Sequence, residues 1–202
     1  LPLHATLELL VWDAERPDRQ GVRAVEAEAM PLRDGDRVRV SLQLNQPAYV
    51  YLVWLDAEGA ALPVYPWIQG KWERPAGERM QTHMTLPDPQ DEGWLMDVKQ
   101  DGAESLLLLL RRSPLPAAID LQQLLDEVPH PLLANVSAAT WFQDGQPLPA
   151  SHPPETGTQR PLVLKGSVRI QDPLLQMQRR TADVLRPHFE LIRAISFPVQ
   201  GD

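Results

Sequence analysis

Histidines are the side chains of this sequence best suited to acid-base or metal chemistry near neutral pH. The chain has five of them, and none lies at the one-turn spacing that places two metal ligands on the same face of a helix. They are His4, His83, His130, His152 and His188. We therefore expect surface or singly hydrogen-bonded histidines and predict no metal site. A metal site built from them would require the fold to bring distant positions together.

Carboxylates gather in three short stretches, and neighbouring carboxylates can share acid-base roles or bind calcium. The three stretches contain Asp34 and Asp36, then Asp56 and Glu58, then Asp88, Asp91 and Glu92. An Asp close to glycine between two strands is also what a turn requires, because its side chain hydrogen-bonds the local backbone. We expect turns at all three places, with calcium or acid-base chemistry as the alternative.

The motifs of common enzyme classes are absent from the sequence. It contains no glycine-rich phosphate loop, no Gly-x-Ser-x-Gly elbow, no His-Glu-x-x-His and no kinase catalytic loop. The absence of cysteine removes disulfides, thiolate metal sites and Cys nucleophiles. We predict that the chain is not an enzyme and has no catalytic residues and no cofactor. A hydrolase, the enzymatic alternative, would need at least two of the scattered His and carboxylates in one pocket.

Three aromatic residues stand close together in a segment that also contains Pro and Gly: Tyr65, Trp67 and Trp72. Aromatic side chains on a rigid loop offer large contact area at low entropic cost, and they form stacking platforms for sugars, peptides or partner proteins. We predict that these three residues bind a partner. The alternative is that Trp67 and Trp72 fold back as a lid and bury apolar area over an open end of the core.

Charge and hydropathy exclude two classes of partner. The formal net charge is -8 and the 19 Lys and Arg are scattered, so no basic patch for nucleic acid is expected. The longest apolar run covers residues 106–110, far short of a membrane span. We predict a cytoplasmic protein, with the periplasm as the alternative. Because residue 1 is Leu and a strand pattern begins at once, we expect a part of a longer protein, of unknown oligomeric state.

Period-two alternation and β-branched or aromatic composition predict seven strands in the first part of the chain. They are expected at residues 3–12, 21–30, 38–44, 48–55, 60–65, 94–98 and 105–112. The strands at 48–55 and 105–112 are apolar on both faces and should lie deep in the sheet. The turn at 56–59 predicts a hairpin, and the turn at 100–102 should join the last two strands. Residues 66–92 are predicted to be a long loop.

The later part of the chain changes its pattern. Helical spacing predicts one short helix over 119–128 and a second that begins after Asp172 and ends at Pro187. Further strands are expected at 136–142, 161–170 and 188–199. We predict a β-sandwich core over 1–128, a proline-rich wrapping segment over 129–160 and a strand-helix-strand extension over 161–202 that packs on the same core. The predicted fold is mainly β, an antiparallel β-sandwich with one or two peripheral α-helices.

Four segments, residues 31–40, 48–56, 64–67 and 104–111, together with the prolines that follow, form a set of motifs that extends over roughly 31–127. These motifs resemble a bacterial domain family, the domain of unknown function 4384. Members of that family accompany Ser/Thr kinase or caspase-like peptidase domains. The resemblance therefore implies an accessory module of a signalling or defence protein, and it brings no catalytic residues with it.

Together these observations predict a non-catalytic regulatory or recognition module of a larger bacterial protein. Its partner is expected to be a protein or peptide, such as the kinase or peptidase domain of the same chain. The alternative is a carbohydrate- or peptide-binding domain that works outside the cytoplasm.

Overall fold

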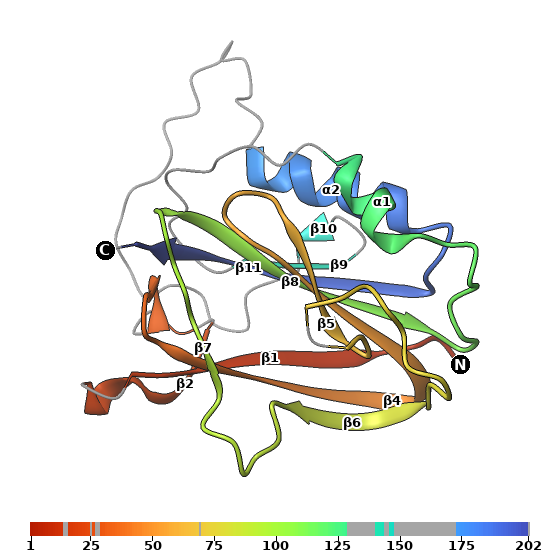
Figure 1. The fold of residues 1–202 in the computed structure, drawn as a ribbon. Coiled ribbons are helices and arrows are strands. Elements are labelled where there is room, and N and C mark those ends of the chain that lie inside the picture. Colours follow the sequence, from red (N-terminus) through yellow and green to blue (C-terminus); the bar gives the residue numbers. More distant parts are fainter. Residues whose placement is uncertain are drawn as a thin grey trace.

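The fold was analysed in a computed structural model, which describes residues 1–13, 16–24, 26, 29–68, 70–128, 140–143, 146–147 and 173–201. The structure is mainly β with two α-helices, in agreement with the predicted fold class (Figure 1). The strands are β1 (Ala5–Trp12), β2 (Gln20–Arg23), β3 (Leu32–Arg33), β4 (Arg37–Leu55), β5 (Ala61–Tyr65), β6 (Gln81–Leu86), β7 (Trp94–Leu95), β8 (Gly102–Arg111), β9 (Thr140–Gln143), β10 (Gln146–Pro147) and β11 (Leu191–Gln200). The helices are α1 (Leu121–Asp126), α2 (Pro173–Leu185) and the short 3-10 helix η1 (Pro17–Arg19).

Strand β4 joins the two halves of one curled sheet. Its first half pairs with β1, from Arg37 to Leu44, and its second half pairs with β8, from Tyr49 to Leu55. The sequence predicted two separate strands here, from the alternation that ends at Leu44 and the apolar run that begins at Ala48. The structure instead shows one strand of 19 residues, with the pairing to β6 irregular between Gln43 and Ala48. Pro47 fits extended backbone, so the strand continues while the partners change.

The order of the strands departs from a purely antiparallel sandwich. The main path runs β10-β9-β11-β8-β4-β1-β2, and among the described strands β3 pairs with β11 in parallel. Strands β5, β6 and β7 each pair with β4. The predicted hairpin of 48–55 and 60–65 is confirmed by the antiparallel pairing of β4 and β5. The pairing of 94–98 with 105–112 is wrong, because β7 pairs with the beginning of β4 instead.

Two other strand predictions need correction. The strand expected over 21–30 ends at Arg23, where the backbone turns and Glu26 N–H donates to the Arg23 carbonyl. The loop expected over 66–92 contains β6, which is hydrogen-bonded to the first half of β4. Most side chains of β6 are exposed or half-buried, so this edge strand lacks the apolar alternation that would have revealed it. The strand expected at 161–170 lies outside the described residues, as does most of the segment 129–160.

The main core lies between the two halves of the curled sheet. On β8, the side chains of Leu106, Leu108 and Leu110 share one face of the strand and are fully buried in this core. Val38, Val40, Leu42 and Leu44 of β4 face it from the other half, as the period-two pattern predicted. Successive side chains of a strand point to opposite faces, so Leu107 and Leu109 must pack elsewhere.

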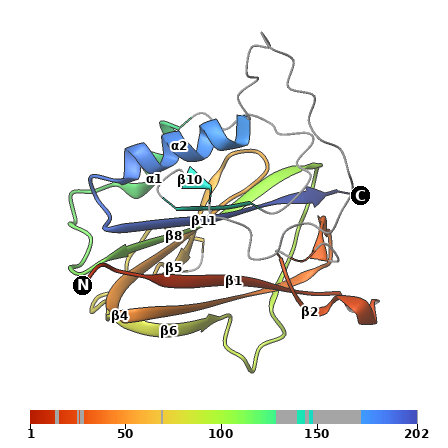
Figure 2. The ribbon, with the colours of Figure 1, turned by 180° about the vertical axis from the view of Figure 1, so that it is seen from behind.

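A layer of helices covers that second face. Both ribbon views show α1 and α2 on the outer side of β8 and β11, away from β1 and β6 (Figures 1 and 2). Leu121 and Leu125 of α1 and Leu185 of α2 are buried there with Leu107 and Leu109 of β8. Asp120 is the N-cap residue of α1, and its carboxylate accepts a hydrogen bond from the Gln123 backbone N–H. No helix in the described part of the chain is long and apolar enough to cross a membrane.

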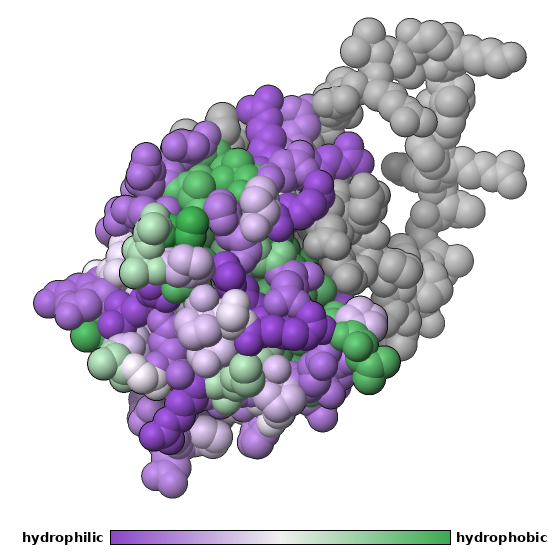
Figure 3. All heavy atoms as spheres, turned by 90° about the vertical axis from the view of Figure 1, so that its right-hand side faces the viewer, coloured by the Kyte–Doolittle hydropathy of each residue, from purple (hydrophilic) through white to green (hydrophobic). Residues whose placement is uncertain are grey.

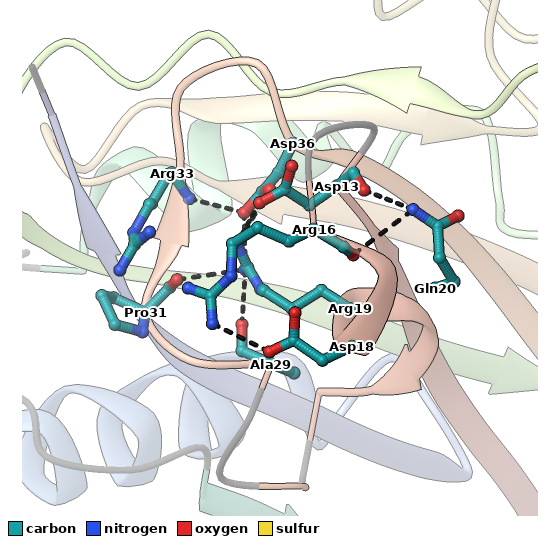
Figure 4. A network of polar contacts seen from close by, with 9 residues as sticks. All are labelled: Asp13, Arg16, Asp18, Arg19, Gln20, Ala29, Pro31, Arg33 and Asp36. Carbon is teal, nitrogen blue, oxygen red and sulfur yellow. Dashed lines mark hydrogen bonds and ion pairs between the residues drawn. The ribbon is translucent and has the colours of Figure 1, made fainter.

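A buried arginine ties the η1 segment to the turn before β4 (Figure 4). Arg19 as a residue is only 1% exposed, and its guanidinium donates to both carboxylate oxygens of Asp36 at 3.0 and 2.7 Å. It also donates to Asp13 at 3.2 Å and to the Ala29 carbonyl at 2.8 Å. The Asp36 carboxylate also accepts a hydrogen bond from the Arg33 backbone N–H, so the same carboxylate stabilises both the turn and the ion pair.

We predict that Arg19→Ala destabilises the protein by about 3 to 5 kcal/mol, because the buried Asp36 carboxylate loses its counter-charge. Urea unfolding followed by tryptophan fluorescence measures the effect. Arg16→Ala is the matched control, since Arg16 pairs with Asp18 on the surface and its loss should leave the unfolding midpoint in place. Equal midpoints for the two variants would contradict the prediction.

Candidate functional site

A pocket of about 680 Å³ opens between the two halves of the curled sheet, on the side where β5 and β7 flank β4. This volume falls within the range of about 300 to 1,000 Å³ that is usual for ligand sites. Its lining comes from β4, β5, the end of β6, β7 and the beginning of β8. The lining residues are Val38, Trp54, Asp56, Ala57, Glu58, Leu62, Pro63, Val64, Trp67, Leu86, Pro87, Trp94, Leu95, Met96, Asp97, Lys99, Gln100 and Glu104.

A buried pair, Trp54 and Glu104, forms the inner part of the pocket. The indole N–H of Trp54 donates to Glu104 Oε2 at 2.6 Å. Trp54 of β4 packs in the main core, and Glu104 lies on the same face of the adjacent strand β8 as Leu106, two residues later, which also packs in that core. The Trp54 ring also meets the Phe197 ring edge-on, with 5.4 Å between centroids. The indole therefore has little freedom, and it holds the carboxylate in one orientation.

The Glu104 residue is 6% exposed, and this burial changes its acidity. Burial raises the pKa of the carboxyl from 4.5 to about 7, since water no longer solvates the charge. The hydrogen bonds from Trp54 and from the Ala57 backbone act in the opposite direction, and the nearby Asp56 carboxylate raises the pKa further. The group thus changes its charge close to neutral pH.

The mouth of the pocket combines exposed leucines with charges. Leu62 is 47% exposed and Leu95 is 62% exposed, so two large apolar side chains lie partly in solvent beside the cavity. Asp56, Glu58 and Asp97 add carboxylates, and Lys99 is the cation among the lining residues.

The view onto the side of the molecule where the chain begins is mostly hydrophilic, with apolar residues in separate patches (Figure 3).

The three aromatic residues predicted to bind a partner are divided between the two hydrophobic clusters. Trp67 is 7% exposed and packs in the cluster between the sheet and the two helices, called here the helix-side cluster. Its ring centroid lies 5.8 Å from that of Tyr51 and 5.0 Å from that of Trp72. Trp72 is half-buried against the same cluster, whereas Tyr65 packs against the main core. Trp67 nevertheless contributes to the wall of the pocket, so one of the three residues reaches it.

A polar network fastens the loop after β5 to the body of the protein. The Tyr51 hydroxyl donates to Glu78 Oε2 at 2.6 Å and accepts from the Leu115 backbone N–H at 2.7 Å. Arg74 pairs with Glu78 at 3.0 Å and donates to the Leu115 carbonyl at 2.6 Å. Burial and the Glu78 carboxylate raise the pKa of Tyr51 to about 12, so this hydroxyl stays protonated. The loop with Trp67 is therefore held in place.

The described histidines lie apart from this pocket. His4 precedes β1, His83 is exposed on β6 and His188 follows α2, whereas His130 and His152 fall outside the described residues. Within the described ranges, no three His, Asp or Glu side chains are close enough to hold a metal ion.

Some of the carboxylates predicted at turns make the local hydrogen bonds that turns require, and others bind more distant groups. Asp56 accepts from the Glu58 and Ala60 backbone N–H groups, and Asp88 accepts from that of Gln90. Asp34 accepts from the Val98 N–H and so links the turn to the segment after β7. Glu92 forms an ion pair with Arg37.

Sequence reasoning missed the central residue of the pocket. Glu104 stands one period-two step before Leu106, Leu108 and Leu110, on the face that is fully buried. A single carboxylate in phase with a buried run is a signal of a constrained polar group, and it could have singled out this position. Trp94 and Leu95 were predicted only as part of a strand over 94–98, and nothing in that stretch marked them as pocket residues.

The fold and the pocket together define a mainly β domain with a ligand-sized cavity beside a sheet edge. Residues 31–114 match the model of a family described as a domain of unknown function (DUF4384), which supports the resemblance found in the sequence. All residues that line the pocket lie within the matched segment. No curated protein and no solved structure matches the chain.

We predict that the stability difference between Glu104→Gln and the unsubstituted protein depends on pH. The folded-state pKa of Glu104 lies above its unfolded value, so its contribution to stability is fully present below about pH 4.5 and is lost as pH rises through about 7. A pKa difference of this size corresponds to about 3 kcal/mol. Urea unfolding should show Glu104→Gln to be the more stable protein at pH 8, with the advantage shrinking towards pH 5.

Trp54→Phe provides a second readout, because it removes the indole N–H that favours the ionised carboxylate. This variant should lose more stability at pH 8 than at pH 5. If both differences are independent of pH, Glu104 does not titrate in this range.

We predict that Trp67→Ala lowers the free energy of unfolding by about 3 to 5 kcal/mol, since it removes a large buried ring from a packed cluster. Trp72→Ala should cost less because that ring is only half-buried. Ile68→Ala is the control within the same loop, as Ile68 is exposed. Thermal unfolding followed by circular dichroism compares the three variants, and a Trp67→Ala protein as stable as Ile68→Ala would favour the platform over the lid.

Proposed function

We propose that this chain is a non-catalytic recognition module that binds a protein or peptide partner at the pocket between β5 and β7. The observation that carries the proposal is the combination of a ligand-sized cavity with the exposed side chains of Leu62 and Leu95 at its mouth. Exposed apolar groups beside a concave surface are typical of binding sites, because their burial contributes affinity when a partner arrives.

The polar groups of the pocket support binding more than catalysis. An acid-base mechanism needs a nucleophile or a second titrating group within hydrogen-bonding distance of the first. Among the described residues, Glu104 is hydrogen-bonded to the indole of Trp54, which neither gives nor takes a proton. Asp56 is occupied by two backbone N–H groups of its own turn.

The wider setting of this module is also a proposal. Residues 31–114 match a family described only as a domain of unknown function, in line with the resemblance of the sequence to that family. On the strength of this resemblance we propose that the chain is part of a larger bacterial protein that carries a Ser/Thr kinase or caspase-like peptidase domain and works in the cytoplasm. The partner is then that enzyme domain or a protein that it acts on. The loop with Tyr65, Trp67 and Trp72 adjoins the pocket through Trp67 and extends the contact surface.

A capture experiment with charge substitutions tests the proposed surface. Immobilised protein is incubated with lysate of the source organism, and the retained proteins are identified by mass spectrometry. Leu95→Asp should lose a partner that the unsubstituted protein retains, because a charge at the mouth opposes apolar docking. Ile68→Asp asks whether the aromatic loop takes part.

Met80→Asp is the matched control, since Met80 is also exposed, at 46% against 62% for Leu95, but does not line the pocket. Cooperative thermal unfolding of all variants is checked first. Retention of one protein set by all four forms, or of nothing by the unsubstituted form, would count against the proposal. A specific hit on a glycan array would instead favour the carbohydrate-binding alternative.

A further inference from the structure

The charges that line the pocket do not balance. Four carboxylates, Asp56, Glu58, Asp97 and Glu104, face one ammonium group, that of Lys99. None of the ion pairs formed by the described residues uses any of these four carboxylates. A concave site with an excess of one sign of charge concentrates ligands of the opposite sign. The pocket therefore favours a cation.

Glu104 is the carboxylate best placed to receive that cation. Only 6% of this residue is exposed, and the Trp54 indole N–H donates a hydrogen bond that fixes one of its carboxylate oxygens. A carboxylate has about four acceptor positions, so one indole N–H and one backbone N–H leave room for further donors. A charged donor at this depth makes a stronger hydrogen bond than it does in water.

The walls favour a guanidinium over an ammonium group. Trp54 and Trp94 present indole rings, and Leu62, Leu95 and Met96 add apolar surface. A guanidinium is planar and weakly hydrated, stacks on aromatic rings and bonds a carboxylate with two parallel donors. An ammonium group is strongly hydrated and loses more on entering such a site. A contact of this kind occurs elsewhere in this protein, where the guanidinium of Arg39 lies 5.3 Å from the centroid of the Trp12 ring.

The strand beside the pocket suits an extended peptide. Among the described strands, β5 is hydrogen-bonded to β4 alone, and its residues Leu62, Pro63 and Val64 line the pocket. A peptide that lies along such an edge points alternate side chains in the same direction. The cavity is large enough to take one long side chain together with part of an apolar neighbour.

We propose that the pocket binds an arginine side chain of the partner, carried on an extended segment with apolar neighbours, so that the guanidinium pairs with Glu104 and lies against the indoles of Trp54 and Trp94. This inference rests on the proposed function, because it names the group that the partner brings to the pocket. The apolar neighbours of the arginine contact Leu62 and Leu95 at the mouth.

Binding and protonation are linked in this arrangement. A guanidinium favours the ionised form of Glu104, whose pKa is otherwise raised to about 7. The other charged groups around the ligand are Asp56 and Glu58 from the turn after β4, and Asp97 and Lys99 from the segment after β7. Affinity for the cation should therefore increase as pH rises from 6 to 8.

Blocked pentapeptides test the assignment by isothermal titration calorimetry. The probe is N-acetylated, C-amidated Gly-Leu-Arg-Leu-Gly, compared with peptides that carry lysine or citrulline in place of arginine. Citrulline has nearly the same shape as arginine but no charge. We expect the arginine peptide to bind at least tenfold more tightly than the citrulline peptide at pH 8, and more tightly than the lysine peptide.

Two variants locate the effect. In Glu104→Gln, the preference for arginine over citrulline and its rise between pH 6 and 8 should both disappear. Asp126→Asn is the matched control, because Asp126 is exposed on α1 and outside the pocket, and it should bind as the unsubstituted protein does. The intrinsic fluorescence of folded Glu104→Gln confirms that the variant keeps its structure.

The remaining outcomes overturn the inference. These are equal affinity for arginine and citrulline, equal affinity for lysine, an unchanged preference in Glu104→Gln, or no binding of any peptide at millimolar concentration. If a cellular partner is nevertheless lost on Leu95→Asp, the recognition function stands and only the arginine assignment fails. If capture shows no dependence on Leu95, the proposed function fails independently of the peptide result.

Discussion

Strand β4 is hydrogen-bonded in both halves of the sheet, and the other layers depend on this shared strand. Its first half pairs with β1 and its second half with β8, so the chain passes from one half to the other without a loop. The main core fills the space between the halves, and the second half of β4 and all of β8 must be covered on their outer face too. Helices α1 and α2 provide that cover, which explains why the apolar runs on these two strands do not alternate.

The same geometry creates the pocket. Where β4 changes partners, the strands on its outer edge also change, from β6 and β7 to β5, and these strands do not pair with one another. The core therefore ends at an open side, with Trp54 and Glu104 at its inner boundary. Burial of a carboxylate there lowers stability at neutral pH, and a strongly perturbed carboxylate that lines a cavity marks a candidate functional site.

The segment that matches the domain of unknown function is not a complete structural unit. Residues 31–114 contain β4 to β8 and the whole lining of the pocket, but β1 and β11 lie outside. Both are needed, because β1 completes the first half of the sheet and β11 covers the free edge of β8. The buried Arg19 also lies outside residues 31–114. Its guanidinium binds the carboxylate of Asp36, in the turn just before β4. The matched segment thus carries the site, and the flanking strands stabilise it.

The sequence by itself determined the local features: the alternation of Val38 to Leu44, the buried strands around Val50 and Leu108, the Asp-Gly turns and the helix after Asp120. Each depends on side chains a few residues apart, so the pattern is visible in one stretch of chain. Only the tertiary structure decided that β4 is continuous, that β6 exists and that β11 pairs with β8. It also brought Glu104 to Trp54, 50 residues earlier in the chain. These outcomes depend on hydrogen-bond register between distant segments and on burial by other layers, and neither leaves a mark on the local sequence.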